Sequence, residues 1–340
     1  MPKFPHQPST IKDVAESAGV STATVSRVIS GNGKVSKKLA RRVKNTIDTL
    51  DFHPNQAARR LRHQKSKIVG VVLSDIQNPF FTSLVVGIES VLQEKGYLLI
   101  LGNSCEDQNR EYQHLNTFLS EQVSGIIFTS SGNDASYYKK LLAAGIPLIA
   151  VDRRPPDLDV DSVQLANEKA SFEAVNHLFS EGHRRIGLIA GLETLTTGSE
   201  RREGYVHAFQ TAGLPLDPKL IRGGDFRQDS GYRSMGALLD LPEPPSAVLV
   251  SNNLMTLGAL QMIHERNLDI PSQISIIGFD DIAWASSLRP PMTVIAQPVA
   301  DMGVAAANLL LERIDNPDGP IKHLTFETKL IVRASCMCAK

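Results

Sequence analysis

Two patterns of hydrophobic positions divide the chain near residue 67. Before this point, apolar residues spaced three and four positions apart predict short helices over residues 11–18, 22–29 and 37–50. After it, short apolar runs alternate with longer amphipathic segments. This alternation predicts parallel sheets with helices on both faces. The chain therefore begins with an all-α head and continues as an α/β body.

The head carries the local signals of a helix-turn-helix. Thr10, Ser21 and Ser36 can cap the three helices, because a side-chain oxygen at that position accepts a free backbone N–H. Gly19 ends the first helix and permits a tight turn before the second. Two short helices joined by such a turn are typical of a module that places its second helix in the major groove of DNA.

The outward face of the second helix has short side chains that can approach base edges. Threonine and alanine methyl groups fit thymine, hydroxyl groups reach bases or phosphates, and an arginine can bridge guanine O6 and N7. An ordinary surface helix of a three-helix bundle is the alternative. We predict DNA contacts from Ser21, Thr22, Ala23, Thr24, Ser26 and Arg27.

A basic segment follows the head. Asn55 can cap a short helix in which Leu61 is the single large apolar residue among three arginines, of which Arg59 is the first. An isolated helix of this length is marginal in water. Against DNA it can become stable, with arginines on phosphates and Leu61 inserted into a minor-groove base step. A flexible basic linker is the alternative.

Charge separates the two parts of the chain. Residues 1–67 hold 14 lysines and arginines against 4 aspartates and glutamates, whereas the remainder holds 22 against 32. The formal net charge of zero therefore hides a basic head on an acidic body. This distribution is expected when only the head meets nucleic acid. A solvated basic tail is the alternative that charge alone leaves open.

The chain length, the longest apolar runs, the cysteine count and the missing motifs disfavour several classes of protein. The 340 residues favour two or three domains over one core. No apolar run approaches the roughly 18–20 residues that span a bilayer, and the start MPKFPHQPST lacks the apolar core of a signal peptide. Three cysteines do not make a disulfide framework, so we expect a cytoplasmic protein without a metal or cofactor. The motifs GxxxxGK[ST], GxGxxG, HExxH and GxSxG are missing, which disfavours an enzyme.

Polar residues after the predicted strands of the body indicate a ligand site. Two successive series of strands and helices predict two doubly wound lobes, with a ligand between them at the carboxyl ends of the strands. Carboxylates, amides, guanidinium groups and an aromatic ring there suit a hydroxyl-rich ring such as a sugar. The loops expected at the cleft are 74–81, 129–131, 151–154, 199–202, 224–226, 251–253 and 278–281.

The segments TIKDVAESAGVSTATVSRVISG and HPNQAARRLR, together with the two-lobed body, resemble the lactose-repressor (LacI/GalR) family of bacterial transcriptional regulators. The similarity runs from about Thr10 to Arg333. It implies that Thr22, Ala23 and Arg27 read bases and that a hinge helix places its leucine in the minor groove. It also implies a body like that of periplasmic binding proteins and a homodimer that acts on operator DNA.

The same resemblance implies roles in the cleft. Arg201, in the segment RREGY, would bind the effector, with Asn252 and Asp280 at two strand ends. One departure is the pair Asn252-Asn253, where many relatives have Asn-Asp, so that an amide replaces a carboxylate. With the neighbouring loops included, the candidate effector-binding residues are Asp75, Phe80, Thr129, Asp152, Arg153, Arg201, Phe226, Asn252 and Asp280.

We therefore predict a helix-turn-helix head at 1–53 and a hinge helix with linker at 54–66. The body would contain two doubly wound parallel sheets. Its first lobe would comprise residues 67–163 plus 296–323, and its second lobe 164–295 plus 324–340.

The predicted function is that of a repressor of carbohydrate-catabolism genes, working as a homodimer beside the nucleoid and away from any membrane. An effector between the lobes would change its affinity for double-stranded operator DNA. Arginines on or near the cleft loops favour a sugar acid such as gluconate or 2-ketogluconate, because guanidinium groups bind carboxylates in a bidentate manner. A neutral sugar or a nucleobase is the alternative ligand. A solute-binding protein of the same shape is the alternative class, disfavoured by the basic head.

Overall fold

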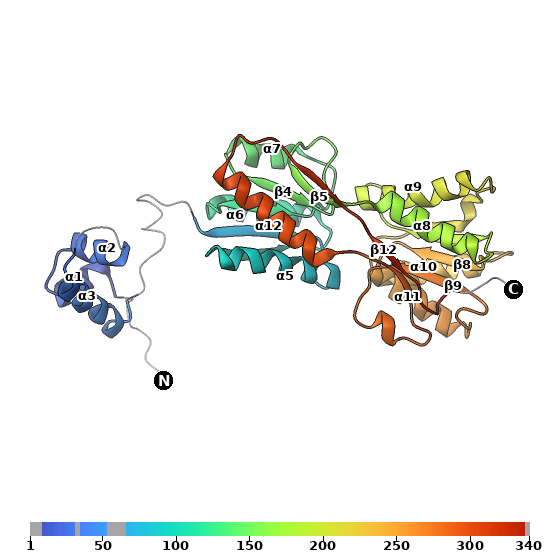
Figure 1. Ribbon diagram of the computed structural model, residues 1–340, viewed down its shortest axis with the longest axis horizontal. Helices are drawn as coiled ribbons and strands as arrows, with labels where there is room; N and C mark the ends of the chain where they lie inside the picture. Colours follow the sequence, from blue (N-terminus) through green and yellow to red (C-terminus); the bar gives the residue numbers. More distant parts are fainter. Residues whose placement is uncertain (1–8, 31–34, 53–65, 337–340) are drawn as a thin grey trace. The chain divides into compact units, whose positions relative to one another are not determined.

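A computed structural model describes residues 9–30, 35–52 and 66–336 of the chain. The chain divides into two compact units, residues 1–66 and 67–340 (Figure 1). The first unit contains the three helices predicted for the head. They are α1 (Ile11–Ser17), α2 (Thr22–Ser30) and α3 (Lys37–Thr49).

The helices of the first unit begin where the sequence predicts. Thr10 and Asp13 form a capping box at α1, with the Thr10 N–H donating to the Asp13 carboxylate at 2.6 Å. Gly19 adopts φ +60°, the left-handed conformation that favours glycine, and the Ser21 hydroxyl then accepts the N–H of Thr24 at 3.2 Å. The buried core lies between the three helices and consists of Val14, Ala15, Ala18, Val25, Val43 and Phe52.

The second unit contains two sheets of six strands, one in each lobe. The first sheet has the order β11-β5-β4-β3-β1-β2 and is parallel throughout. Its strands are β1 (Ile68–Leu73), β2 (Leu98–Asn103), β3 (Gly125–Phe128), β4 (Leu148–Val151), β5 (Asp161–Leu165) and β11 (His323–Phe326).

The second sheet has the order β12-β10-β9-β8-β6-β7 and is parallel except for the β10–β12 pair. Its strands are β6 (Ile186–Ala190), β7 (Ile221–Gly223), β8 (Ala247–Val250), β9 (Ser275–Phe279), β10 (Thr293–Ala296) and β12 (Lys329–Ile331). The prediction of two doubly wound sheets is thus confirmed, with one antiparallel edge strand added.

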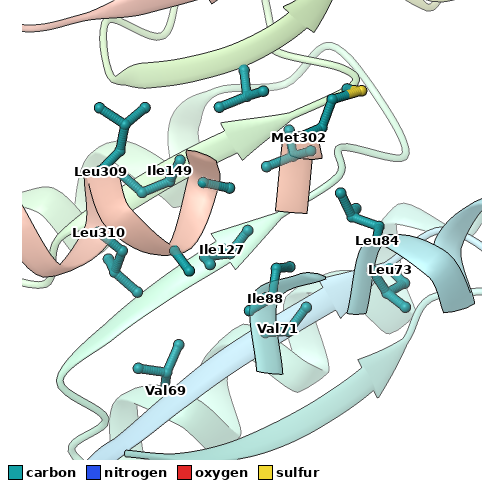
Figure 2. Close-up of a cluster of buried hydrophobic side chains, with 14 of the residues drawn as sticks. Val69, Val71, Leu73, Leu84, Ile88, Ile127, Ile149, Met302, Leu309 and Leu310 are labelled. Carbon is teal, nitrogen blue, oxygen red and sulfur yellow. The ribbon is translucent and has the colours of Figure 1, made fainter. Parts of the chain in front are cut away.

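Helices cover both faces of the first sheet because its strands are apolar on both sides. Val69 and Val71 pack on one face against α5 (Pro79–Glu94) and α12 (Val299–Asp315), as Figure 2 shows. Val72 points to the opposite face, towards the side chains of α6 (Gln108–Ser120) and α7 (Ser136–Ala143). The strands thus alternate between two separate cores.

The second lobe repeats this arrangement. Helices α10 (Gln228–Leu239) and α11 (Asn253–Glu265) cover one face of its sheet. Helices α8 (Asn167–Ser180) and α9 (Thr196–Thr211) cover the other. Two short 3-10 helices, η1 (Pro218–Leu220) and η2 (Ala285–Ser287), lie in its connections. Among the residues that the structure describes, no helix is long and apolar enough to cross a membrane.

The chain passes between the two sheets three times. It leaves the first sheet after Leu165, returns from β10 to α12, and leaves again between β11 and β12. The lobe boundaries expected after residues 163, 295 and 323 therefore shift by one to three residues. The reason is that β5 and β11 stay paired with each other as far as Leu165 and Phe326, and β10 stays paired with β12 as far as Ala296.

Candidate functional site

A narrow cavity of about 20 Å³ lies between the two lobes at the carboxyl ends of their strands. It collects seven of the nine predicted effector-binding residues, together with four that the sequence analysis did not single out. The predicted ones are Phe80, Asp152, Arg153, Arg201, Phe226, Asn252 and Asp280, and the additional ones are Asn78, Phe81, Thr197 and Gln297.

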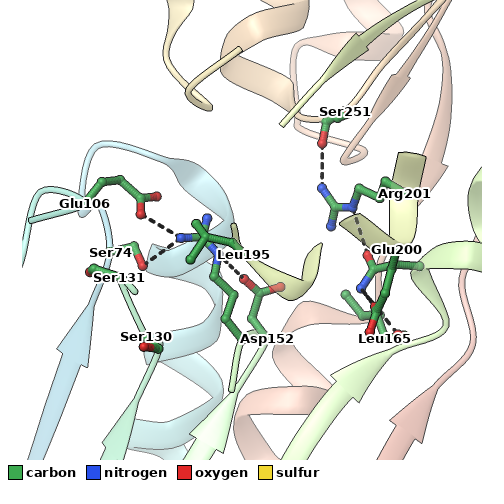
Figure 3. Close-up of polar contacts among 12 residues, drawn as sticks. Ser74, Glu106, Ser130, Ser131, Asp152, Leu165, Leu195, Glu200, Arg201 and Ser251 are labelled. Carbon is green, nitrogen blue, oxygen red and sulfur yellow. Dashed lines mark hydrogen bonds and ion pairs between the residues drawn. The ribbon is translucent and has the colours of Figure 1, made fainter. Parts of the chain in front are cut away.

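Arg201 is fixed on the second-lobe side of this cavity, with 4% of its surface exposed. Its Nε donates to Asn167 at 2.8 Å and its Nη1 donates to the carbonyl of Ser251 at 2.5 Å (Figure 3). The guanidinium carbon lies 4.0 Å from the centroid of the Phe279 ring. Burial lowers the pKa of Arg201, and the nearby charge of Asp152 opposes this effect. The result is a rigidly held cation at the cavity wall.

Arg153 is the second buried guanidinium of the cavity. Its Nη1 donates to Glu106 at 2.6 Å and to Ser74 at 3.3 Å, and its Nε lies 3.4 Å from a carboxylate oxygen of Asp152. Burial lowers its pKa, but Glu106 and Asp152 outweigh that effect, so the pKa of Arg153 is raised overall. Figure 3 shows Ser74, Glu106 and Asp152 gathered on one side of the site. The charge of Arg153 is therefore already balanced by protein carboxylates.

Two buried aspartates present acceptors at strand ends. Asp152 follows β4 with φ 65° and Asp280 follows β9 with φ 75°, a left-handed conformation that aspartate tolerates better than most residues. Burial raises the pKa of both carboxyl groups, and that of Asp280 reaches about 6. Asp280 accepts the N–H of Asn253 at 3.2 Å and also a hydrogen bond from Gln297.

Asn252 lines the cavity and also hydrogen-bonds to two of the segments around it. Its Oδ1 accepts the N–H of Met255 at 2.9 Å and so caps α11, while its Nδ2 donates to the carbonyl of Phe226 at 2.8 Å. One hydrogen of Nδ2 remains for a ligand. The side chain therefore links a helix start to the loop that carries the aromatic ring.

Two predicted residues do not line the cavity. Asp75 is half-buried and caps a turn by accepting the N–H of Gln77 at 2.9 Å. Thr129 is buried at the end of β3. The side chain of Arg153 runs from β4 to Ser74 after β1 and Glu106 after β2, and β3 lies between these strands. Arg153 thus reaches across the end of β3, and Thr129 is not among the residues that line the cavity.

A further buried carboxyl lies close to Arg153 in the first lobe. Glu111 in α6 is fully buried, and one of its oxygens accepts the N–H of Ser131 at 2.7 Å. Its other oxygen has no hydrogen-bond partner among the described residues. Burial raises the pKa of Glu111 to about 7. No sequence signal distinguishes it, because a glutamate in the first turn of a helix is normally a solvated charge.

Some of the predicted DNA-contacting residues have exposed side chains, some are half-buried, and some lie outside the described residues. Ser21, Thr22, Ala23 and Arg27 are exposed on the first unit, as expected for a face that meets DNA. Thr24 and Ser26 are half-buried, and the Thr24 hydroxyl lies 3.0 Å from that of Ser21. The three hinge candidates lie outside the described residues. They are Asn55, Arg59 and Leu61.

Comparison with known proteins matches both units. Residues 10–55 match the model for bacterial regulatory proteins of the lacI family, and residues 175–336 match a periplasmic binding protein-like domain. Over 329 residues the chain is 35% identical to the HTH-type transcriptional repressor CytR of Escherichia coli (strain K12), with 96% of each chain covered.

Two solved structures are similar along nearly the whole chain. A complex of the transcriptional regulator CelR with cellobiose is 33% identical, with a TM-score of 0.73 and coverage of 96% of this chain and 99% of that chain. The Lac repressor dimer bound to operator and the anti-inducer ONPF is 27% identical, with a TM-score of 0.85 and coverage of 97% and 100%.

Proposed function

Because the chain belongs to the LacI family of bacterial regulatory proteins, we propose that it is a repressor whose affinity for operator DNA is lowered by a small neutral carbohydrate bound between its lobes. The family makes it a DNA-binding transcriptional regulator rather than an enzyme. Repression and release by a carbohydrate are the parts that we add. The charge balance of the buried cavity carries the class of ligand, and the similarity to the CytR repressor supports repression.

The charges around the cavity favour a neutral ligand over a sugar acid. Asp152, Glu106 and Asp280 contribute carboxyl groups, and two guanidinium groups of the described residues face them. A ligand carboxylate that paired with Arg153 would displace Glu106 or Asp152 and leave a buried protein carboxylate without its partner. One that paired with Arg201 would lie beside the carboxyl groups of Asp152 and Asp280. Leaving a buried charge unpaired costs several kcal/mol, on the order of 3–5. A hydroxyl group can instead donate to an aspartate and accept from Arg201 without displacing either.

The preference for a sugar acid inferred from the number of arginines remains a prediction, and the pairing of Arg153 weakens it. The CelR structure contains cellobiose, a neutral disaccharide, which supports the class of ligand proposed.

For assembly we propose a homodimer formed through the exposed edge of the first lobe. Leu98 and Ile100 in the edge strand β2 and Val86 in the adjacent helix α5 are large apolar side chains that are 64%, 37% and 64% exposed. Exposed apolar groups on neighbouring elements are typical of an interface. A two-fold dimer would present two helix-turn-helix units to a pseudo-palindromic operator. The dimeric Lac repressor structure supports this arrangement.

The test uses the full-length protein and a fluorescent duplex that it selects from a random DNA pool. Release of the duplex is measured during titration with matched pairs, glucose with gluconate and galactose with galactonate, and with adenine as a nucleobase. Release by a neutral sugar and not by its acid supports the proposal. Release by the acid member alone overturns the neutral class, and release by adenine alone overturns the carbohydrate class.

A further inference from the structure

A buried hydrogen bond joins the two lobes beside the cavity. The side-chain Nδ2 of Asn253, at the start of α11 in the second lobe, donates to Oδ1 of Asn78 in the first lobe at 2.8 Å. The two residues are 1% and 7% exposed, so water does not compete for this contact. Position 253 is also where the sequence departs from the Asn-Asp pattern of many family members.

The direction of this hydrogen bond is fixed by the structure around it. Oδ1 of Asn78 also accepts the N–H of Phe80 at 2.9 Å and so caps α5. The atom that faces Asn253 is therefore an acceptor, and Asn253 must supply the donor. The backbone N–H of Asn253 is itself held by Asp280 at 3.2 Å, which fixes the position of the residue.

We propose that Asn253 is a latch residue that stabilises contact between the lobes and thereby sets how readily the protein responds to its effector. A ligand shifts an equilibrium between lobe states only by its differential affinity for them, so the stability of the closed contact enters directly into the response. The latch itself follows from the hydrogen bond. Its regulatory consequence rests on the proposed function.

A second hydrogen bond across the cleft, away from the crossing segments, is weaker because it is exposed to solvent. Nη2 of Arg227 donates to the carbonyl of Cys105 at 3.0 Å, but this pair is exposed to solvent. Outside the three segments where the chain crosses between the sheets, and within the described part of the chain, the Asn253–Asn78 pair is the interlobe hydrogen bond that is buried at both ends. A carboxylate at position 253 would place an acceptor against the Asn78 acceptor and add a negative charge beside Asp280.

The test uses the fixed direction of the hydrogen bond and changes asparagine to aspartate at its donor end and, separately, at its acceptor end. In Asn253→Asp the donor is lost. In Asn78→Asp the acceptor is kept, and aspartate is as good a helix cap as asparagine. Hydrogen–deuterium exchange of the full-length proteins is followed by mass spectrometry in peptides spanning residues 78–82 and 252–256. Peptides from strands β3 and β8 report on unfolding of each lobe.

We expect Asn253→Asp to accelerate exchange in both cleft peptides about tenfold, the effect of losing one buried hydrogen bond, with β3 and β8 unchanged. Asn78→Asp should leave the cleft peptides at the wild-type rate. Equal acceleration in both variants, or acceleration in neither, overturns the latch.

A second measurement separates the latch from its regulatory role. Affinity for the selected DNA duplex is compared between wild type, Asn253→Asp and Asn267→Asp, which makes the same amide-to-acid change at an exposed position after α11. A change of threefold or more in Asn253→Asp alone supports coupling to DNA binding. Faster cleft exchange with unchanged DNA affinity keeps the latch and overturns the allosteric function.

Discussion

The guanidinium of Arg153 in the first lobe lies over the ring of Phe226 in the second, with 4.9 Å between the guanidinium carbon and the ring centroid. The tip of the ring lies against Gly191, just after β6, where an added Cβ would lie 2.1 Å from Cζ of Phe226. Arginine and phenylalanine thus close one wall of the cavity, and a glycine leaves the room for them.

Replacing Gly191 with alanine should displace Phe226 and destabilise the second lobe. Overpacking a tight interior costs about 1–3 kcal/mol, so the free energy of unfolding measured in urea should fall by that amount. Gly223→Ala is the matched control, because nothing lies within 4 Å of a Cβ at that position. Equal stability of the two variants would contradict the close packing of Phe226 on Gly191.

Removing Arg27 should weaken specific DNA binding more than non-specific binding. The side chain is exposed on α2, and a bidentate contact with guanine is worth about 1–3 kcal/mol of discrimination. Binding of Arg27→Ala is measured on the selected duplex and on random DNA. Arg41→Ala, an exposed arginine of α3, is the control and should change both affinities by the same factor. A uniform loss for Arg27→Ala would argue that it contacts phosphate.

Arg201→Ala should abolish the response to effector and also destabilise the second lobe. Its removal leaves Asp280 without the cation that offsets it, a loss on the order of 3–5 kcal/mol, whereas Asp152 keeps Arg153. Arg202→Ala provides the control, since its exposed ion pair with Glu193 at 3.1 Å contributes about 1 kcal/mol or less. Urea unfolding and ligand-induced release of DNA are measured for both. A retained response in Arg201→Ala would place the ligand elsewhere.

Glu111 should make stability depend on pH near neutrality. Its pKa of about 7 in the folded protein lies above the ordinary 4.5, so between these pH values the folded state binds more protons than the unfolded state. Stability therefore falls as pH rises through this window and levels off above it. At about 1.4 kcal/mol per pKa unit, the contribution amounts to about 3 kcal/mol at most.

The variant Glu111→Gln lacks this titration. Its free energy of unfolding should therefore rise relative to that of wild type between pH 5 and pH 8. Urea titrations at the two pH values provide the measurement. A relative stability that does not change with pH would show that Glu111 keeps the same charge across the range.

Leu98→Lys should break the proposed dimer. Each copy would lose a buried leucine worth about 1.5–3 kcal/mol, so two copies predict a dissociation constant at least about 100-fold larger. Sedimentation velocity at several concentrations measures the change. Leu324→Lys in β11, at the opposite edge of the same sheet, is the control and should remain dimeric. An unchanged dimer in Leu98→Lys would exclude β2 from the interface.

The sequence predicted the architecture well because strong apolar runs specify strands buried on both faces. Elements with weaker patterns were not singled out. Strand β5 reads DSVQL, with polar residues at three of its five positions, and β7 has three residues. Helix α10 contains two glycines and two serines, which lower its helical signal. The two strands take their places in the sheets by pairing with neighbouring strands, and the helix packs on its sheet. No local sequence pattern indicates these contacts.

Strand-end position predicted most of the residues that line the cavity, since parallel strands end at a common edge. Strand-end position did not indicate which charged side chains of the cavity pair with one another. Arginines at 153 and 201 look equivalent in the sequence, yet one is balanced by Glu106 and the other faces the cavity near two aspartates. Asn78 and Asn253 lie 175 positions apart, and only the folded lobes bring them together.

The return of α12 to the first lobe has a consequence for synthesis on the ribosome. Met302, Leu309 and Leu310 complete the core on which β1 and α5 pack. The head can fold as soon as residue 52 has emerged, because its core ends at Phe52. The first lobe must wait until α12 and β11 have been translated, after the second lobe's parallel strands. For most of its synthesis, a nascent chain therefore carries a folded DNA-binding head joined to a body whose first lobe is still incomplete.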